Sequence, residues 1–197
     1  MKKDAIPVLG TTLLFCTLTP RPPLWAQDSI LQLDPVETTI NFTLGATLHT
    51  VHGIFKLKSG VIHFNPASGE ASGAILVDAA SGDSGNEARD RDMHRKVLES
   101  ERYPEIAFAV DRFEGRVAPE GQSDLQVHGA LSLHGFEHEM TADVSLQTAG
   151  DQATATTHLI IPYVKWGLKN PSTLFLRVRD TVEVEIHAVG HLTKGGT

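Results

Sequence analysis

The side chains with most chemical potential in this sequence are its ten histidines. His134 and His138 flank an expected turn and could meet across it, with a glutamate on either side of His138. No His-Glu-x-x-His sequence is present, and the single cysteine, Cys16, lies in an N-terminal segment that we expect to be removed. The pattern therefore predicts scattered, solvated histidines and no metal site.

Serines and carboxylates show no arrangement typical of catalysis. No Gly-x-Ser-x-Gly sequence joins a strand to a helix. Residues 81–85 (SGDSG) are glycine-rich but lack the Gly-Lys-Ser/Thr ending of a phosphate-binding loop, so we expect a flexible connection there. Asp90 and Asp92 are two positions apart, and such residues do not face each other on a helix. The sequence predicts that the protein is not an enzyme.

Charge is distributed unevenly along the chain. The formal net charge of −7 excludes a general nucleic-acid-binding role, because phosphate contacts require clustered Lys and Arg. Residues 152–179 nevertheless contain four basic and no acidic side chains. Arg and Lys suit an anionic headgroup, and the alternative is a solvated strand face with no partner. The headgroup candidates are Arg89, Lys165, Lys169 and Arg177.

The elements that must position these residues are mostly strands. Apolar residues alternate with polar ones in segments such as 39–44, 140–146 and 182–187, which is typical of antiparallel sheet with one buried face. About eight such strands follow one another, separated by turn signals, so we expect a barrel or a sandwich. Residues 86–98 break this pattern and predict one short helix, capped by Asp83, Ser84 or Asn86.

The first 26 residues do not fit the β pattern. Two lysines precede a mostly apolar stretch, prolines break it, and Leu24-Trp25-Ala26 provides a small residue for cleavage. This order is typical of a secretory signal peptide, so we expect cleavage near Ala26 and a periplasmic or secreted protein. Residues 27–197 then form a single domain, with a net charge of −9 and no cysteine.

Three stretches together resemble the YceI-like family of lipid- and polyisoprenoid-binding proteins. They are Leu33-Asp34-Pro35 with residues 40–66, residues 88–108 (ARDRDMHRKVLESERYPEIAF), and residues 127–140 (VHGALSLHGFEHEM). The resemblance spans roughly residues 30–192. One element departs from it, because IPYVKWGLKNPSTLFLRVRD stands where the family has Arg-x-x-Phe-Gly.

The resemblance implies an extended, eight-stranded, lipocalin-like antiparallel barrel that holds a long apolar chain. An eight-stranded barrel is just wide enough either to be filled by side chains or to hold one ligand. Trp166 fits a pocket rim or simple packing, and ten strand residues are inward candidates by parity. The apolar ligand-binding candidates are Ile40, Phe42, Leu44, Ile75, Val77, Leu131, Leu133, Val144, Trp166, Val182 and Val184.

These observations favour an exported protein that carries, stores or sequesters an amphiphilic lipid of the polyisoprenoid, isoprenoid quinone or fatty-acyl type. Such a ligand would be its only bound group, and transient membrane contact would accompany lipid exchange. Two alternatives remain open at this point. One is a stress or interaction protein with a filled barrel, and the other is a metal-dependent enzyme that uses His134 and His138.

Overall fold

The computed structural model describes residues 28–47, 49–173 and 176–194, so the expected signal peptide lies outside the described residues. Strands dominate the fold, and one short helical segment interrupts them. The strands are β1 (Ser29–Leu33), β2 (Thr39–Gly45), β3 (Thr50–Phe64), β4 (Glu70–Asp83), β5 (Glu105–Gly115), β6 (Gly121–Leu133), β7 (Phe136–Ala149), β8 (Gln152–Ile161) and β9 (Val182–Lys194). Among the described residues, no helix is long and apolar enough to cross a membrane.

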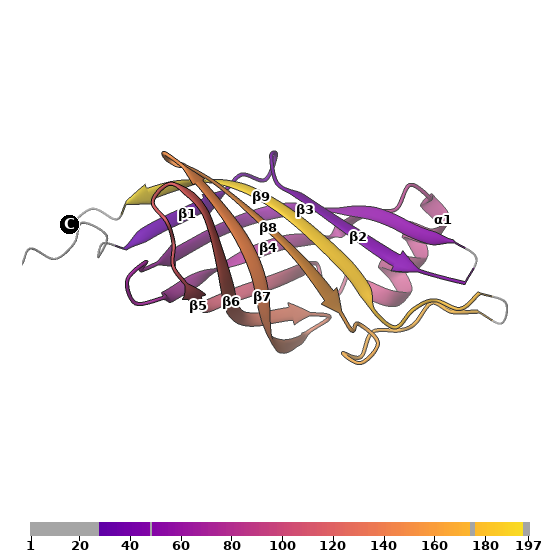
Figure 1. Ribbon diagram of the computed structural model, residues 1–197. Coiled ribbons are helices and arrows are strands. Elements are labelled where there is room, and N and C mark those ends of the chain that lie inside the picture. The colour runs from indigo at the N-terminus through magenta and orange to yellow at the C-terminus, as the bar shows by residue number, and fades with distance from the viewer. Residues whose placement is uncertain (1–27, 48, 174–175, 195–197) are drawn as a thin grey trace, which may run out of the picture.

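The strands form one closed antiparallel barrel (Figure 1). Strands β3 to β8 each pair with the next strand along the chain, and β9 returns to pair with both β1 and β2. Nine strands occupy eight positions, because β1 and β2 lie end to end between β3 and β9. The eight-stranded barrel inferred from the resemblance is therefore confirmed, with one of its positions divided.

The division falls at Asp34-Pro35, where proline lacks the N–H group that a continuous strand would use. Leu33 pairs with Gly190 and Thr39 with His187, so residues 34–38 bulge out opposite only two residues of β9. The Asp34 side chain accepts hydrogen bonds from the backbone N–H groups of residues 36 and 37, at 2.6 and 3.2 Å. This local turn allows β2 to resume in the same position of the barrel.

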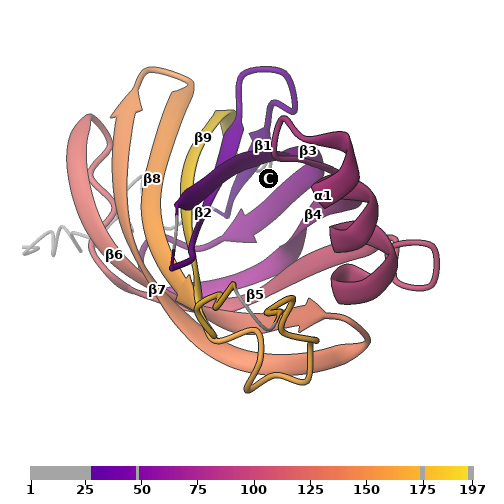
Figure 2. The same cartoon turned by 90° about the vertical axis from the view of Figure 1, so that its right-hand side faces the viewer.

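The two ends of the barrel differ in their connections. Because consecutive strands are antiparallel, the β2–β3, β4–β5, β6–β7 and β8–β9 connections lie at one end, which we call the mouth end. The opposite end, called the far end, holds only the short β3–β4, β5–β6 and β7–β8 connections and the outer ends of β1 and β9. Figure 2 views the mouth end, with the helical segment on one side and the β8–β9 connection below it.

The predicted helix over residues 86–98 is present as two joined segments, α1 (Glu87–Asp92) and the π-helical η1 (Met93–Leu98). Asn86 caps the N-terminus, because its side chain accepts the Arg89 backbone N–H at 3.0 Å. The helix ends where Glu99 adopts a left-handed conformation, with φ of 47°. Met93 and Val97 turn toward the barrel interior, which fits their four-residue spacing.

Buried side chains form three clusters along the barrel axis. Leu33, Ile40, Leu57 and Ala188 lie in the middle of the barrel. Phe113, Leu125, Leu146 and Ala153 fill the far end, and Leu133, Ile161, Tyr163 and Leu168 pack at the mouth end. These clusters support the wall at three levels and leave a space enclosed between them.

Candidate ligand-binding cavity

A cavity of about 690 Å³ runs along the inside of the barrel. Its wall is almost wholly apolar, because the alternating strand residues that point inward are Leu, Ile, Val, Phe, Met and Ala, with Thr157 as the exception. It extends from Leu192 and Phe64 at the far end to His49 and Thr173 at the mouth end. A volume in this range is typical of sites that enclose a small or medium-sized ligand.

The structure places the ten inward candidates of the strands on the cavity wall. Each lines the cavity: Ile40, Phe42, Leu44, Ile75, Val77, Leu131, Leu133, Val144, Val182 and Val184. Their contact with a ligand remains a prediction. Sequence parity did not identify two polar lining residues, Thr157 of β8 and Thr38 of the bulge between β1 and β2.

Trp166 does not line the cavity. It lies in the β8–β9 connection, where its ring stacks on His138 with 4.2 Å between centroids and 4° between planes. Tyr163 and Leu168 of the same connection occupy the wall in its place. The connection therefore folds over the start of β7, and Trp166 packs that side of the mouth end.

The cavity opens at the mouth end. Most of its lining residues are buried or half-buried, and the exposed ones are His49, Asp92, Pro171 and Thr173. These four come from the β2–β3 connection, the helix and the β8–β9 connection, which border the same end of the barrel (Figure 2). At the far end every lining residue is at least half-buried, so a ligand would enter through the mouth end.

Arg89 is the one headgroup candidate that lines the cavity. Its Nε–H donates to Ser84 Oγ at 2.7 Å, and its Nη2–H donates to the Ser84 carbonyl at 2.8 Å. Asp90 in turn accepts hydrogen bonds from the hydroxyl and the backbone N–H of Ser84. Within the described residues Nη1 has no hydrogen-bond partner, so the guanidinium is held in place with a donor still available.

The carboxylate at the opening, Asp92, is paired with Arg95 and Lys96 of the helix. Asp92 lies beside Arg89 in the cavity lining, and Lys96 Nζ is 2.8 Å from its carboxylate. This hydrogen bond lowers the pKa of Asp92 below its ordinary value, so the carboxylate is ionised at neutral pH. Within the described residues Arg89 forms no ion pair, so the opening presents a fixed guanidinium, which suits a polar headgroup that accepts hydrogen bonds.

The other three headgroup candidates lie outside the cavity. Lys165, Lys169 and Arg177 belong to the β8–β9 connection, are exposed, and do not line the cavity. No carboxylate of the described chain lies within 4.0 Å of any of them, whereas Arg179 pairs with Glu183 at 3.7 Å. The basic stretch is thus at the mouth end but on its outer surface.

His134 and His138 do not face each other as a ligand pair. His134 stacks on Tyr103 with centroids 4.5 Å apart, and His138 stacks on Trp166. Across the described ranges, no three His, Cys, Asp or Glu side chains group as metal ligands. The sequence placed Ser84 in a flexible connection or at a helix cap and did not predict its contact with Arg89. The spacing of Ser84, Arg89 and Asp90 was the available signal.

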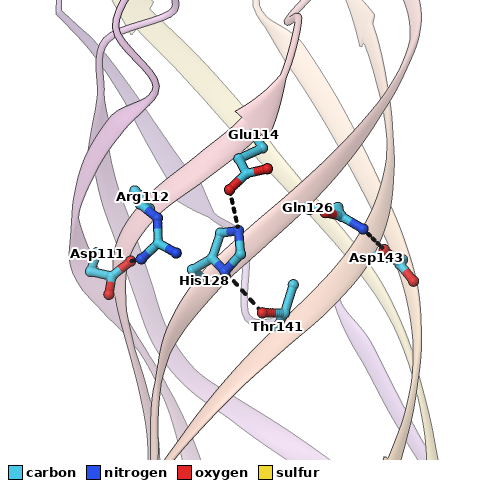
Figure 3. A network of polar contacts seen from close by, with 7 residues as sticks. All are labelled: Asp111, Arg112, Glu114, Gln126, His128, Thr141 and Asp143. Carbon is cyan, nitrogen blue, oxygen red and sulfur yellow. Dashed lines mark hydrogen bonds and ion pairs between the residues drawn. The ribbon is translucent and has the colours of Figure 1, made fainter.

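A second polar network lies on the outer wall, across β5, β6 and β7 (Figure 3). His128 Nδ1 is 2.9 Å from the Thr141 hydroxyl, and its Nε2 is 3.2 Å from Glu114 Oε1. Gln126 donates to Asp143 at 3.1 Å along the same strands. These are cross-strand pairs that stabilise the sheet, and they do not reach the cavity.

Three solved structures have the same fold. BcnA of Burkholderia cenocepacia is 19% identical with a TM-score of 0.65, and the match covers 80% of this chain and 98% of BcnA. A polyisoprenoid binding domain from Saccharophagus degradans, implicated in plant cell wall breakdown, is 14% identical with a TM-score of 0.62, covering 83% and 98%. The YceI protein of Campylobacter jejuni is 20% identical with a TM-score of 0.59, covering 74% and 86%.

No curated protein matches the sequence significantly. The YceI-like domain model, however, matches residues 31–190, which include every strand except the first two residues of β1 and the last four of β9. The helix and nearly all of the barrel therefore fall within that match. The chain therefore belongs to the YceI-like domain family.

Proposed function

We propose that this protein is an exported carrier that holds an amphiphilic lipid of the polyisoprenoid, isoprenoid quinone or fatty-acyl type. The observation that carries the proposal is the apolar cavity of about 690 Å³, whose exposed lining residues all lie at one end. The apolar tail would occupy the barrel and the headgroup would stay at the mouth end. No chemical step is needed for such a role.

Two further observations support a binding role. A filled barrel would favour an interaction protein, whereas this barrel encloses a space along its axis. A structural neighbour with 14% identity is a polyisoprenoid binding domain, and this chain shares its fold. Burial of apolar surface alone contributes about 25 cal/mol per Å², so a long tail needs few polar contacts.

The headgroup would be bound by Arg89. Its guanidinium is fixed by Ser84 at the cavity wall and retains a donor, and it forms no ion pair within the described residues. Arg89→Gln should therefore weaken binding of an isoprenoid quinone or prenyl phosphate more than binding of an unsubstituted isoprenoid hydrocarbon. Equal losses for the polar and the hydrocarbon ligands would assign Arg89 a structural role instead.

The location is proposed from the N-terminal sequence. Residues 1–26 have the charge, apolar stretch and small residue of a signal peptide, and removal near Ala26 would release the barrel outside the cytoplasm. The intact mass of the protein from the periplasmic or secreted fraction tests this. A mass that still includes residues 1–26 would contradict it.

The decisive experiment is native mass spectrometry of protein purified without detergent, followed by organic extraction of the bound lipid. Ala155→Phe should lower lipid occupancy, because Ala155 lines the middle of the cavity and a ring there would block it. Ala109→Phe is the matched control, since Ala109 is exposed on β5 and does not line the cavity. An adduct of equal abundance in both variants would place the lipid elsewhere.

A further inference from the structure

We propose that the mouth end is a docking surface for a membrane that contains anionic lipids. This inference rests on the proposed function, because docking would let a lipid tail pass between bilayer and cavity without crossing water. The docking surface consists of Lys165, Lys169 and Arg177 of the β8–β9 connection, with the exposed apolar side chains of Phe136 and Ile160 at the same end of the barrel.

The first argument is charge. The β8–β9 connection carries four basic residues and one acidic residue, Asp180, which accepts a hydrogen bond from Asn170 at 2.7 Å. Lys165, Lys169 and Arg177 are exposed, and no carboxylate of the described residues lies within ion-pair distance. The chain as a whole carries −7, so an anionic membrane would attract this connection and repel the rest of the protein.

The second argument is the position of exposed apolar side chains. Phe136 is 59% exposed at the start of β7, two residues before His138, on which Trp166 of the connection stacks. Ile160 is 62% exposed near the end of β8, immediately before the connection. Basic residues next to exposed aromatic and aliphatic side chains are typical of surfaces that bind in the headgroup region of a bilayer.

The third argument is that the opening lies within the same surface. Pro171 and Thr173 line the cavity and are exposed, and they lie between Lys169 and Arg177 in the sequence. A bilayer that contacts the basic residues would therefore border the opening as well. An acidic protein would satisfy the charges but would not require the apolar side chains or the adjacent opening, so a membrane is favoured.

The test is co-sedimentation of the mature protein with vesicles of equal parts phosphatidylcholine and phosphatidylglycerol, and with vesicles of phosphatidylcholine alone. Each basic residue near an anionic surface contributes about fivefold in affinity, so K165Q/K169Q/R177Q should lose about 100-fold. The charge-matched control K56Q/R112Q/R116Q changes exposed residues of the wall and the far end. It should leave vesicle binding unchanged.

The apolar contribution has its own pair of variants. Phe136→Ser should weaken binding to the anionic vesicles about tenfold, because a half-exposed ring would no longer insert. Val36→Ser is the control, since Val36 is 91% exposed but lies in the bulge between β1 and β2. Equal effects of the two serine variants, or of the two triple variants, would overturn the docking surface.

Binding of a soluble quinone separates this inference from the proposed function. Wild-type protein that binds the quinone but not the anionic vesicles would overturn docking and leave the carrier function intact. Wild-type protein that binds vesicles but neither quinone nor extractable lipid would overturn the carrier function alone. Wild-type protein that binds polyglutamate but not vesicles, and loses polyglutamate binding in K165Q/K169Q/R177Q, would overturn membrane docking. The docking surface would then bind an acidic protein instead.

Discussion

Lengthening an isoprenoid ligand by one five-carbon unit at a time should raise its affinity until the chain reaches the far end of the barrel. The cavity wall on β9 runs from Val182 at the mouth end to Leu192 at the far end. Ten residues of strand span about 33 Å, and a strand tilt of about 40° reduces this to about 25 Å along the barrel axis.

An extended isoprene unit is about 5 Å long, from C–C bonds of about 1.5 Å, so the cavity accepts about five units. For ligands of this size each buried heavy atom contributes about 0.3 kcal/mol, or about 1.5 kcal/mol per unit. Affinity should therefore rise about tenfold per unit and stop rising after about five units.

Displacement of a fluorescent fatty-acid probe by prenyl alcohols of two to nine units measures this series. Ala155→Phe sharpens the test. Ala155 pairs with Ala188, which is six residues along β9 from Val182. The new ring would therefore lie about 15 Å along the barrel axis from the opening. The plateau should then move to about three units, whereas Ala109→Phe should leave it in place. A series with no dependence on length, or with a plateau unmoved by Ala155→Phe, would refute binding along the barrel axis.

Three other predictions concern stability. Burial raises the pKa of Tyr163 to about 12, so the neutral phenol stabilises the fold below pH 10. The free energy of unfolding should fall by about 2–3 kcal/mol as the pH rises from 10 through 12. Urea unfolding of Tyr163→Phe should lack this loss. Asn86→Ala should cost about 1 kcal/mol of helix stability and speed hydrogen exchange of the Arg89 amide, whereas Asn86→Asp should keep the cap. Leu125→Ala should lower the free energy of unfolding by about 2–5 kcal/mol, and Val61→Ala on the exposed face by less than about 1 kcal/mol.

Strand identity and the inward face could be predicted from the sequence, because a barrel wall buried on one side imposes a period of two. The helix over residues 86–98 was also predictable, since its charges and its Asn86 cap are local features. The division of β1 from β2 was missed. Its signal, Asp34-Pro35, shows a turn but not that the next strand resumes in the same position.

The opening was harder to predict because it is assembled across connections. His49, Asp92 and Thr173 are far apart in sequence and meet only when the barrel closes. The role of Trp166 depended on how the β8–β9 connection folds, and stacking on His138 turns the ring away from the cavity. Local periodicity carries no information about either arrangement.

The pairing of β9 with both β1 and β2 has a consequence for how the molecule is made. The barrel closes only when residues 29–43 meet residues 183–194, so its seam joins the two ends of the domain. Contacts of such high sequence separation slow folding, since loop-closure entropy must be overcome before they form. A growing chain cannot complete this barrel until its last strand has been synthesised, so the closed barrel forms only after synthesis of the whole domain.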